Sequence, residues 1–510
     1  MNKIYKSLLI AACVFGAVRA GDTTNKTFLL PRPAGVNLPM EMTTFGELTM
    51  LEKEDRFGGN FQLVPFFQQS SNHSKIAEYF LINHKSTIRL ATGTNPTDPS
   101  NATDLDINYL LHDIAWGTEG HKPAASFSLD PEQTIYGLRV DYHQNMDKIL
   151  RGLYLTINLP IVHVENKKGS AVSNTTNSTA YTNVKTTLAE YLRGDYAKAQ
   201  DAGGTITNSQ LKLIYAKIGG KQSDTGVADI DIALGYKFFN KEKYFGSVAI
   251  GLTIPTGNEA DGVHMFTPIV GNGKHFGLGA DLNLGGRIWG DIDHNFKAIA
   301  RMKYRYLFEN SERRTFGIKG YNWGPYLLLV QAGVTHGTAT SLIPAANVTT
   351  LNADVTPGSQ FDGILGITYN NGGFNLDLGY NAYIRENEHV HIKDAFEAGK
   401  YAVANRSYDT SSTAADDHHV TPGTITIGLN NITDGGAAAG TKAILSKDTL
   451  NSDAASTPSQ FTNSLYAGLG YNFKEWDSPL MLGLGGKYEW ASKNSALTQW
   501  DIYGKIGIGF

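Results

Sequence analysis

Apolar and polar residues alternate along most of this chain with a period of two. In the segment 227–239, Ile230 and Ile232 fall on one face, while Asp229 and Asp231 fall on the other. This alternation is the pattern of a β-strand that has one apolar face. The same pattern recurs at 244–255, 275–289, 295–308, 373–385, 461–474, 479–490 and 498–510, and more weakly at 59–70, 134–143, 149–162 and 358–370. The pattern therefore predicts an all-β protein.

The length and the two faces of these segments favour a barrel that crosses a membrane. They run to about ten to fifteen residues, which is long for a globular strand and suits a tilted strand across a bilayer. Aromatic residues such as Tyr236, Tyr304 and Tyr471 gather near strand ends, where membrane barrels carry interfacial girdles. The opposite face holds small or charged residues, as a wet lumen requires. A soluble β-sandwich or propeller also alternates, but these features favour a transmembrane antiparallel β-barrel.

Short turns and long loops must alternate around such a barrel, because periplasmic turns are short and extracellular loops are long. Short turns are expected at 240–243, 290–295, 370–373 and 474–478, and long loops at 71–133, 163–226, 256–274, 309–357 and 386–460. This rule assigns the apolar stretches 211–218 and 326–330 to loops, while 184–199 has helical character. It leaves about twelve strands, with ten or fourteen as alternatives. It also places both termini of the chain in the periplasm.

The N-terminus has the features of a secretory signal peptide. In residues 1–20, Lys3 and Lys6 precede a short apolar core, and Val18 and Ala20 give the small-residue spacing of a cleavage site. A membrane anchor and a lipoprotein cleavage box at Cys13 are the alternatives. Residues 21–58 are expected to hang in the periplasm or to plug the lumen, and residues 59–510 to form the barrel.

Composition excludes several classes of protein. The 510 residues include 44 Lys and Arg against 48 Asp and Glu, and 41% of residues are hydrophobic, which is typical of an ordered chain. The slightly acidic balance argues against a nucleic-acid binder. Beyond the N-terminus no apolar run reaches the roughly 18 residues of a membrane helix.

The last strand ends on outward-facing large apolar residues. These are Trp500, Ile506, Ile508 and the terminal Phe510. This ending resembles the C-terminal assembly signal of bacterial outer-membrane barrels. It implies insertion by the barrel assembly machinery and contact with outer-membrane lipid, so we expect the mature protein in the bacterial outer membrane.

One stretch resembles a known family of channels. Residues 226–262 place a Gly-x-x-Asp strand, a short turn, an aliphatic strand and a Pro-Thr-Gly loop in sequence, and Leu159-Pro160-Ile161 ends an earlier strand. This arrangement resembles the outer-membrane channels associated with meta-pathway phenol degradation and, more distantly, the long-chain fatty-acid transporter barrels. The resemblance implies passage of small, often apolar or aromatic compounds. The long loops at 163–226 and 386–460 depart from the family pattern.

Charged residues on the inward faces are the candidate pore-lining residues. They are Asp229, Asp231, Asp281, Arg287, Lys297, Arg301, Lys303, Arg305, Asp377 and Arg385. Opposed charges across a narrow lumen would set ion preference. Alternatively, they pair across strands and fill the lumen.

The sequence therefore predicts an outer-membrane channel for passive uptake of small molecules, with apolar or aromatic compounds among the candidates. The alternative is a surface adhesin or receptor-like barrel whose loops carry the function. No Gly-x-Ser-x-Gly, Walker or metalloprotease motif is present, so we expect no enzyme and no cofactor. His389, His391, His418 and His419 share one predicted loop, but their spacing fits no closed metal site.

Overall fold

A computed structural model gives the architecture of most of the chain. It describes residues 26–27, 29, 38–42, 58–71, 73–91, 104–105, 109–111, 124–168, 170–174, 187–196, 198–200, 206–208, 210–241, 243–331, 342–403, 444–473, 475–491 and 496–510. The predicted signal peptide at 1–20 lies outside the described residues.

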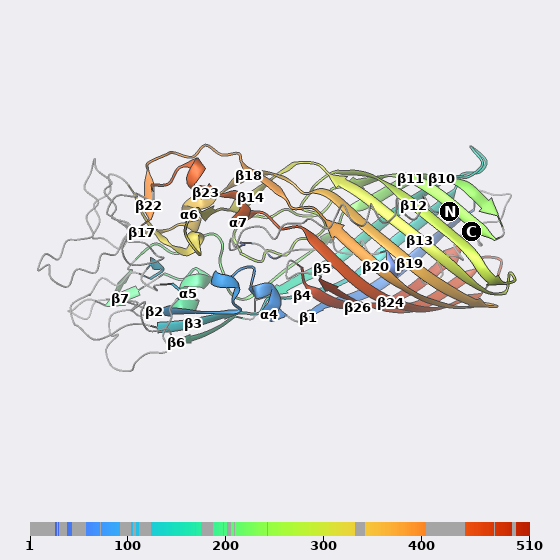
Figure 1. Ribbon diagram of the computed structural model, residues 1–510, viewed down its shortest axis with the longest axis horizontal. Coiled ribbons are helices and arrows are strands. Elements are labelled where there is room, and N and C mark those ends of the chain that lie inside the picture. The colour runs from blue at the N-terminus through green and yellow to red at the C-terminus, as the bar shows by residue number, and fades with distance from the viewer. Residues whose placement is uncertain are drawn as a thin grey trace, which may run out of the picture.

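Twelve long antiparallel strands close into a barrel (Figure 1), as the sequence predicts. In barrel order they are β1 (Gly59–Ser71), β4 (Glu132–Asn145), β5 (Leu153–Lys167), β10 (Ile230–Lys241), β11 (Tyr244–Ile254), β12 (Gly277–Gly290), β13 (His294–Leu307), β19 (Gly358–Asn371), β20 (Phe374–Arg385), β24 (Gln460–Phe473), β25 (Leu480–Ala491) and β26 (Thr498–Gly509). The pairs β1–β26 and β5–β10 close the ring. A shorter strand, β9 (Lys221–Val227), pairs with β5 just before the chain enters β10.

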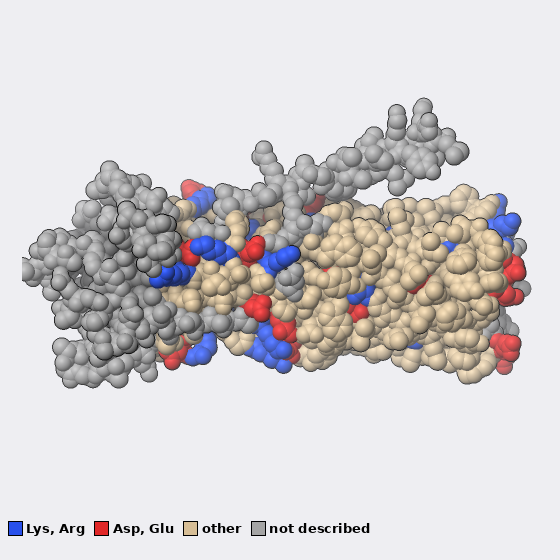
Figure 2. Space-filling view, turned by 60° about the horizontal axis from the view of Figure 1, so that its bottom comes forward, with Lys and Arg blue, Asp and Glu red and all other residues tan. Residues whose placement is uncertain are grey.

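The two faces of the barrel wall have opposite characters. Outward side chains are apolar and exposed, for example Ile250 at 67% and Leu484 at 61% of full exposure. Inward side chains are mostly polar and buried. Figure 2 shows few charged side chains over the middle of the wall, while Lys, Arg, Asp and Glu gather toward its two ends. A wall of this kind requires lipid around it, which identifies a transmembrane barrel.

Short and long connections lie at opposite ends of the barrel. The turn end holds the short links β10–β11, β12–β13, β19–β20 and β24–β25. There Gly59 and Phe510 exchange two backbone hydrogen bonds of 3.0 Å, so the first and last strands meet at this end. The long connections all leave from the other end, which we call the cap end (Figure 1).

The long connections fold into a cap of short elements. Its sheets are β2 (Thr87–Ala91), β3 (Ala124–Leu129) and β6 (Ser170–Asn174); β14 (Asn310–Thr315), β18 (Thr350–Thr356) and β21 (His389–Ile392); β16 (Leu328–Gln331), β17 (Leu342–Pro344) and β22 (Tyr401–Val403); β15 (Gly317–Ile318) and β23 (Leu450–Asn451); and β7 (Lys198–Gln200) and β8 (Ile206–Asn208). Its helices are α4 (His73–Ala77), α5 (Leu188–Arg193), α6 (Ala346–Thr349), α7 (Ser452–Ala455) and the 3₁₀ turns η2 (Ile82–His84), η5 (Gly324–Tyr326) and η6 (Lys447–Thr449). No described helix is long and apolar enough to cross a membrane.

The cap confirms three local predictions. The stretch 326–330 forms part of η5 and the short strand β16 rather than a barrel strand, and 211–218 contains no strand. Within 184–199, the helix α5 starts with a capping box between Thr187 and Glu190 and ends at Gly194 in the left-handed conformation.

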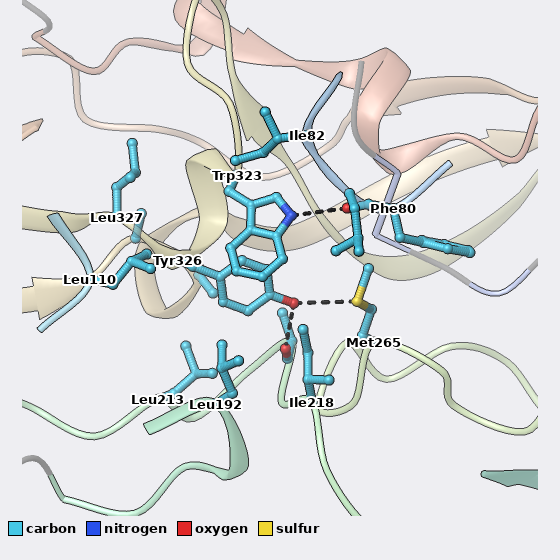
Figure 3. Close-up of a cluster of buried hydrophobic side chains, with 14 of the residues drawn as sticks. Phe80, Ile82, Leu110, Leu192, Leu213, Ile218, Met265, Trp323, Tyr326 and Leu327 are labelled. Atoms are coloured by element: carbon cyan, nitrogen blue, oxygen red, sulfur yellow. Dashed lines mark hydrogen bonds between the residues drawn. The ribbon is translucent and has the colours of Figure 1, made fainter. Parts of the chain in front are cut away.

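A hydrophobic core holds the cap together, a feature that the expectation of polar loops missed. Trp323, just before η5, and Tyr326, its last residue, pack with residues from distant connections (Figure 3). The indole nitrogen of Trp323 donates to the carbonyl of Phe80 (2.9 Å), and the hydroxyl of Tyr326 donates to the carbonyl of Ala216 (2.9 Å). The cap is therefore a folded structure in its own right, because aromatic burial with satisfied polar ends is strongly stabilising.

Candidate functional site

The candidate site lies inside the barrel, where a segment from the N-terminal region occupies the lumen. The lumen segment, Leu38–Met42, contains the helical turn α2 (Pro39–Met42). It is not part of the wall: it touches the inward faces of strands on several sides.

An acidic side chain of the lumen segment bridges two walls. The carboxylate of Glu41 pairs with Arg139 on β4 and, at 2.7 Å, with Nη1 of Arg301 on β13. In barrel order β13 lies five strands from β4 in a ring of twelve, so the two arginines approach from nearly opposite sides. Arg139 also donates from Nε to Asp141 (2.7 Å), and Arg301 donates from Nε to the amide oxygen of Asn283 (2.9 Å).

The backbone of the lumen segment is held by a third strand. On β26 the hydroxyl of Tyr503 donates to the carbonyl of Pro39 (2.8 Å), and Nζ of Lys505 donates to the carbonyl of Glu41 (2.7 Å). These contacts use side chains whose polar ends would otherwise face the lumen.

Apolar contacts complete the packing of the lumen segment. Leu38 belongs to a buried cluster with Ile299, Ile364 and Tyr466 from β13, β19 and β24. Met40 is fully buried in a second cluster that includes residues of β1, β4, β5 and β26. The segment thus packs against strands on several sides of the lumen.

Five of the predicted pore-lining residues come together beside the lumen segment. Lys303 pairs with Asp231, and Arg305 pairs with Asp281 at 2.5 Å and approaches Asp231 at 3.6 Å. Arg301 donates to Asn283 on β12. Asn283 lies two residues after Asp281, which is the register partner of Lys303. All of the basic members are buried. Whether they select ions stays a prediction, and the pairs show that the cross-strand alternative describes much of their geometry.

The other predicted residues lie elsewhere on the inward faces. Asp229 accepts hydrogen bonds from the backbone (2.6 Å) and the amide (2.7 Å) of Asn272, and it thereby anchors the connection 256–274. Arg385 points toward the cap, where it pairs with Glu388. Asp377 accepts from Thr368 (2.5 Å). The remaining two, Arg287 and Lys297, are register partners on β12 and β13 toward the turn end.

The sequence prediction missed Glu41, Arg139, Tyr503 and Lys505. Glu41 lies in a region without alternation, so no strand pattern gives its position. Arg139 lies on the inward parity of the weak segment 134–143, and this signal would have found it.

A small cavity lies against the Glu41–Arg301 pair on its turn-end side. Its volume is about 80 Å³, and its lining includes Glu41, Arg301, Asn283, Tyr154 and Phe245. The ring of Tyr154 stacks on His143 at 5.2 Å. The cavity therefore combines aromatic surfaces with the charged groups that hold the lumen segment.

The chain before the lumen segment lies in the cap. The backbone amide of Lys26 donates to the carbonyl of Tyr79 (2.9 Å), and that of Thr27 donates to the carbonyl of Ala454 (3.1 Å). In chain order, the described residues therefore lie in the cap at 26–29, in the lumen at 38–42 and at the turn end at Gly59. The first and last strands meet at the turn end, as predicted, but the residues around Lys26 lie at the cap end.

A buried ionic network joins the cap to the barrel. Arg314 on β14 pairs with Glu312 (2.8 Å) and with Glu388 (3.0 Å), and Glu388 also pairs with Arg385 at the end of β20. Burial alone would raise the pKa of Glu388, but Arg314 and Arg385 together lower it to about 2. This carboxylate is therefore ionised over the physiological pH range.

Within the described parts of the chain, no group of three or more His, Cys, Asp or Glu side chains could hold a metal ion. His389 and His391 lie on β21, whereas His418 and His419 fall outside the described residues.

The predicted assembly-signal residues lie on the outer face of β26. Ile506, Ile508 and Phe510 are exposed at 50%, 41% and 54%, and Trp500 packs against Phe67 with ring centroids 5.5 Å apart. Their role in assembly stays a prediction.

Comparisons with known proteins found similarity only among solved structures. No family model and no curated protein matches the chain. An outer membrane channel from Pseudomonas putida F1 is 10% identical over 90% of this chain and 99% of its own, with a TM-score of 0.36. The toluene transporter TodX of Pseudomonas putida is 8% identical over 94% of each chain (TM-score 0.33).

The β domain of the Bordetella autotransporter Brka is 9% identical over 89% of this chain and 99% of its own, with a TM-score of 0.30. The similar structures thus include channels of the kind that the sequence resembles, and also a barrel of another kind. At these identities and TM-scores the likeness carries no argument about function.

Proposed function

We propose that this protein is an outer-membrane channel for the passive uptake of small solutes, and that the lumen segment closes its bore. The observation that carries the proposal is the position of Glu41, which is paired with Arg139 and Arg301 on nearly opposite walls. Among the described residues, wall side chains hold this segment and no strand pairs with it, so it can leave without opening the barrel wall.

The lumen favours small polar solutes over the apolar or aromatic compounds that the family resemblance implies. Around the lumen segment the wall contributes Arg139, Arg301, Lys303, Arg305 and Lys505, all buried. Once the segment has moved, an apolar solute would have to pass charges that a polar solute can pair with. Three of these side chains, Arg301, Lys303 and Arg305, are among the predicted pore-lining residues.

The location of the channel follows from its wall and from the chain ends. The exposed apolar belt supports insertion in an outer membrane. Export through a cleaved signal peptide at 1–20 and assembly through Trp500, Ile506, Ile508 and Phe510 remain parts of the proposal.

The test is conductance of the full-length mature chain, refolded and inserted in a planar bilayer, with and without Glu41→Ala. Removing one partner of a buried ion pair costs about 3–5 kcal/mol, and here the closed state loses this stability. The wild-type protein should therefore stay closed with rare openings, while Glu41→Ala should conduct steadily.

The matched control is Glu489→Gln, which alters another buried lumen carboxylate, one that pairs with Lys487 (2.7 Å) on its own strand. It should behave as the wild type does. A Glu41→Ala protein that is folded but neither conducts nor admits solutes into liposomes would disprove the channel.

The folded cap favours one second candidate, a surface receptor or adhesin. A hydrophobic core with fully buried Trp323 and Tyr326 is more structure than a permeability barrier needs. Cell binding that is lost when the cap is destabilised, together with a silent Glu41→Ala barrel, would favour this function over transport.

A further inference from the structure

We infer that Arg139 and Arg301 form a carboxylate-binding site, which Glu41 occupies in the closed state and a small carboxylate solute occupies in the open state. This inference rests on the proposed function and deepens it. It names the class of solute as small organic anions with one carboxylate.

The geometry of the Glu41 contact is that of a carboxylate receptor. Nη2 of Arg139 donates a hydrogen bond to Oε1 of Glu41, and Nη1 of Arg301 forms an ion pair with Oε2 at 2.7 Å, so each oxygen faces its own guanidinium. Guanidinium groups match carboxylates in shape and charge better than ammonium groups do. The side chains of Arg139 and Arg301 are only 2% and 10% exposed, so water screens these contacts little.

The charge balance explains why a carboxylate would replace Glu41. When the lumen segment leaves, two buried guanidinium groups lose a shared anion. Arg139 keeps its contact with Asp141, while the Nε bond of Arg301 goes to the neutral amide of Asn283. Taking a shared carboxylate away from two buried guanidinium groups costs free energy, so an anion that arrives as the segment leaves lowers the free energy of the open state.

The cavity beside the pair sets the size and shape of the solute. Its volume of about 80 Å³ adjoins Arg301, and Phe245 and Tyr154 supply apolar surface a short distance from the charge. A solute with a carboxylate and a short apolar tail fits both features: the carboxylate takes the place of Glu41, and the tail lies against the rings. Propionate is the simplest such probe, and propionamide has the same shape without the charge.

Binding is measured first in the Glu41→Ala channel, where the lumen segment no longer competes. Propionate added to a chloride solution should block the chloride current, because it occupies the arginine site more tightly than chloride does. Adding Arg301→Gln to this channel should raise the blocking concentration about tenfold, the effect of losing a charge-assisted contact of about 1.4 kcal/mol. Propionamide should not block either channel, and Glu489→Gln in the same background should leave the block unchanged.

The wild-type protein supplies the second measurement. Liposomes that carry it should take up propionate about tenfold faster than propionamide, since only the carboxylate favours the open state. Equal effects of propionate and propionamide, or an Arg301→Gln channel that is blocked as before, would overturn the inference. In that case steady conduction by Glu41→Ala would still support the channel. If Glu41→Ala stays closed, the proposed function and the inference fail together.

Discussion

The interior of the barrel is mostly polar and charged apart from two apolar clusters around the lumen segment, whereas the core of the cap is apolar. Inside the barrel, buried residues such as Lys487, Glu489 and Asp501 form ion pairs, and large apolar side chains lie outside. Inside the cap, Trp323, Tyr326 and their neighbours form an apolar core.

The medium on the outer surface of each region explains the difference. A barrel wall must present apolar groups to lipid, so the alternation of its strands sends the polar groups inward. The cap faces water, so its apolar groups are buried in the ordinary way. Stability should therefore depend on charge pairing in one region and on apolar packing in the other, and substitutions can test this contrast.

The largest effect is expected from Trp323→Ala in the cap. Trp323 is among the largest fully buried side chains that the structure describes, and its indole satisfies the carbonyl of Phe80. Truncation should cost about 3–5 kcal/mol of cap stability. Limited proteolysis should show cleavage in the cap connections while the barrel keeps its heat-modifiable mobility on a gel. Loss of the barrel along with the cap would show that the two regions do not fold independently.

Lys487→Met should produce an effect of comparable size in the barrel. It leaves the carboxylates of Glu489 and Asp501 buried without their shared cation, which costs about 3–5 kcal/mol. Thermal unfolding in detergent measures this loss. Adding Glu489→Gln should restore part of the stability, because one uncompensated charge is then removed. If Lys487→Met alone left the unfolding temperature unchanged, charge pairing would not be what stabilises the barrel interior.

The same contrast explains which parts of the structure the sequence could predict. Strands that alternate over ten or more residues carry their own signal, so the barrel, its strand number and the inward position of Arg301 follow from the pattern. The cap core joins segments that are far apart: the bond from Trp323 to Phe80 spans 243 residues. Neither partner lies in a periodic segment.

A lumen position was one of the two expectations for residues 21–58, but the partners of the lumen segment could not be predicted, for a related reason. Glu41 gains its role from Arg139 and Arg301, which lie 98 and 260 residues further along the chain, the second separation being 301 − 41. Local patterns contain no information on such a pair. Inward arginines on two strands predict an anion in the lumen, but they do not say that the chain itself supplies it.

Acid should weaken the junction between the cap and the barrel through Glu388. Its pKa falls from 4.5 to about 2 on folding because Arg314 and Arg385 stabilise the carboxylate. A depressed carboxyl pKa adds stability above the unfolded value, and this stability is lost as the pH falls from about 4.5 to 2. The full contribution is about 3 kcal/mol.

The measurement compares cap unfolding in the wild type and in Glu388→Gln across this range. The two proteins should differ most near neutral pH and converge near pH 2, the folded-state pKa. A difference that stays constant with pH would mean that the side chain acts through packing rather than through its charge.

The smallest effect is expected from Lys85→Ala, which removes an ion pair from the surface of the cap. Lys85 pairs with Asp104, as Lys487 pairs with Glu489, but its side chain is 46% exposed, whereas that of Lys487 is 0% exposed. The side chain of Asp104 is only 5% exposed, but water solvates the ammonium of Lys85, so the pair should contribute about 1 kcal/mol. Asp104 would also keep its hydrogen bond from the backbone of Arg89 (2.8 Å). The loss of free energy in cap unfolding for Lys85→Ala should thus be several-fold smaller than the loss in barrel unfolding for Lys487→Met. If Lys85→Ala were as damaging as Lys487→Met, burial would not be the reason that ion pairs matter inside the barrel.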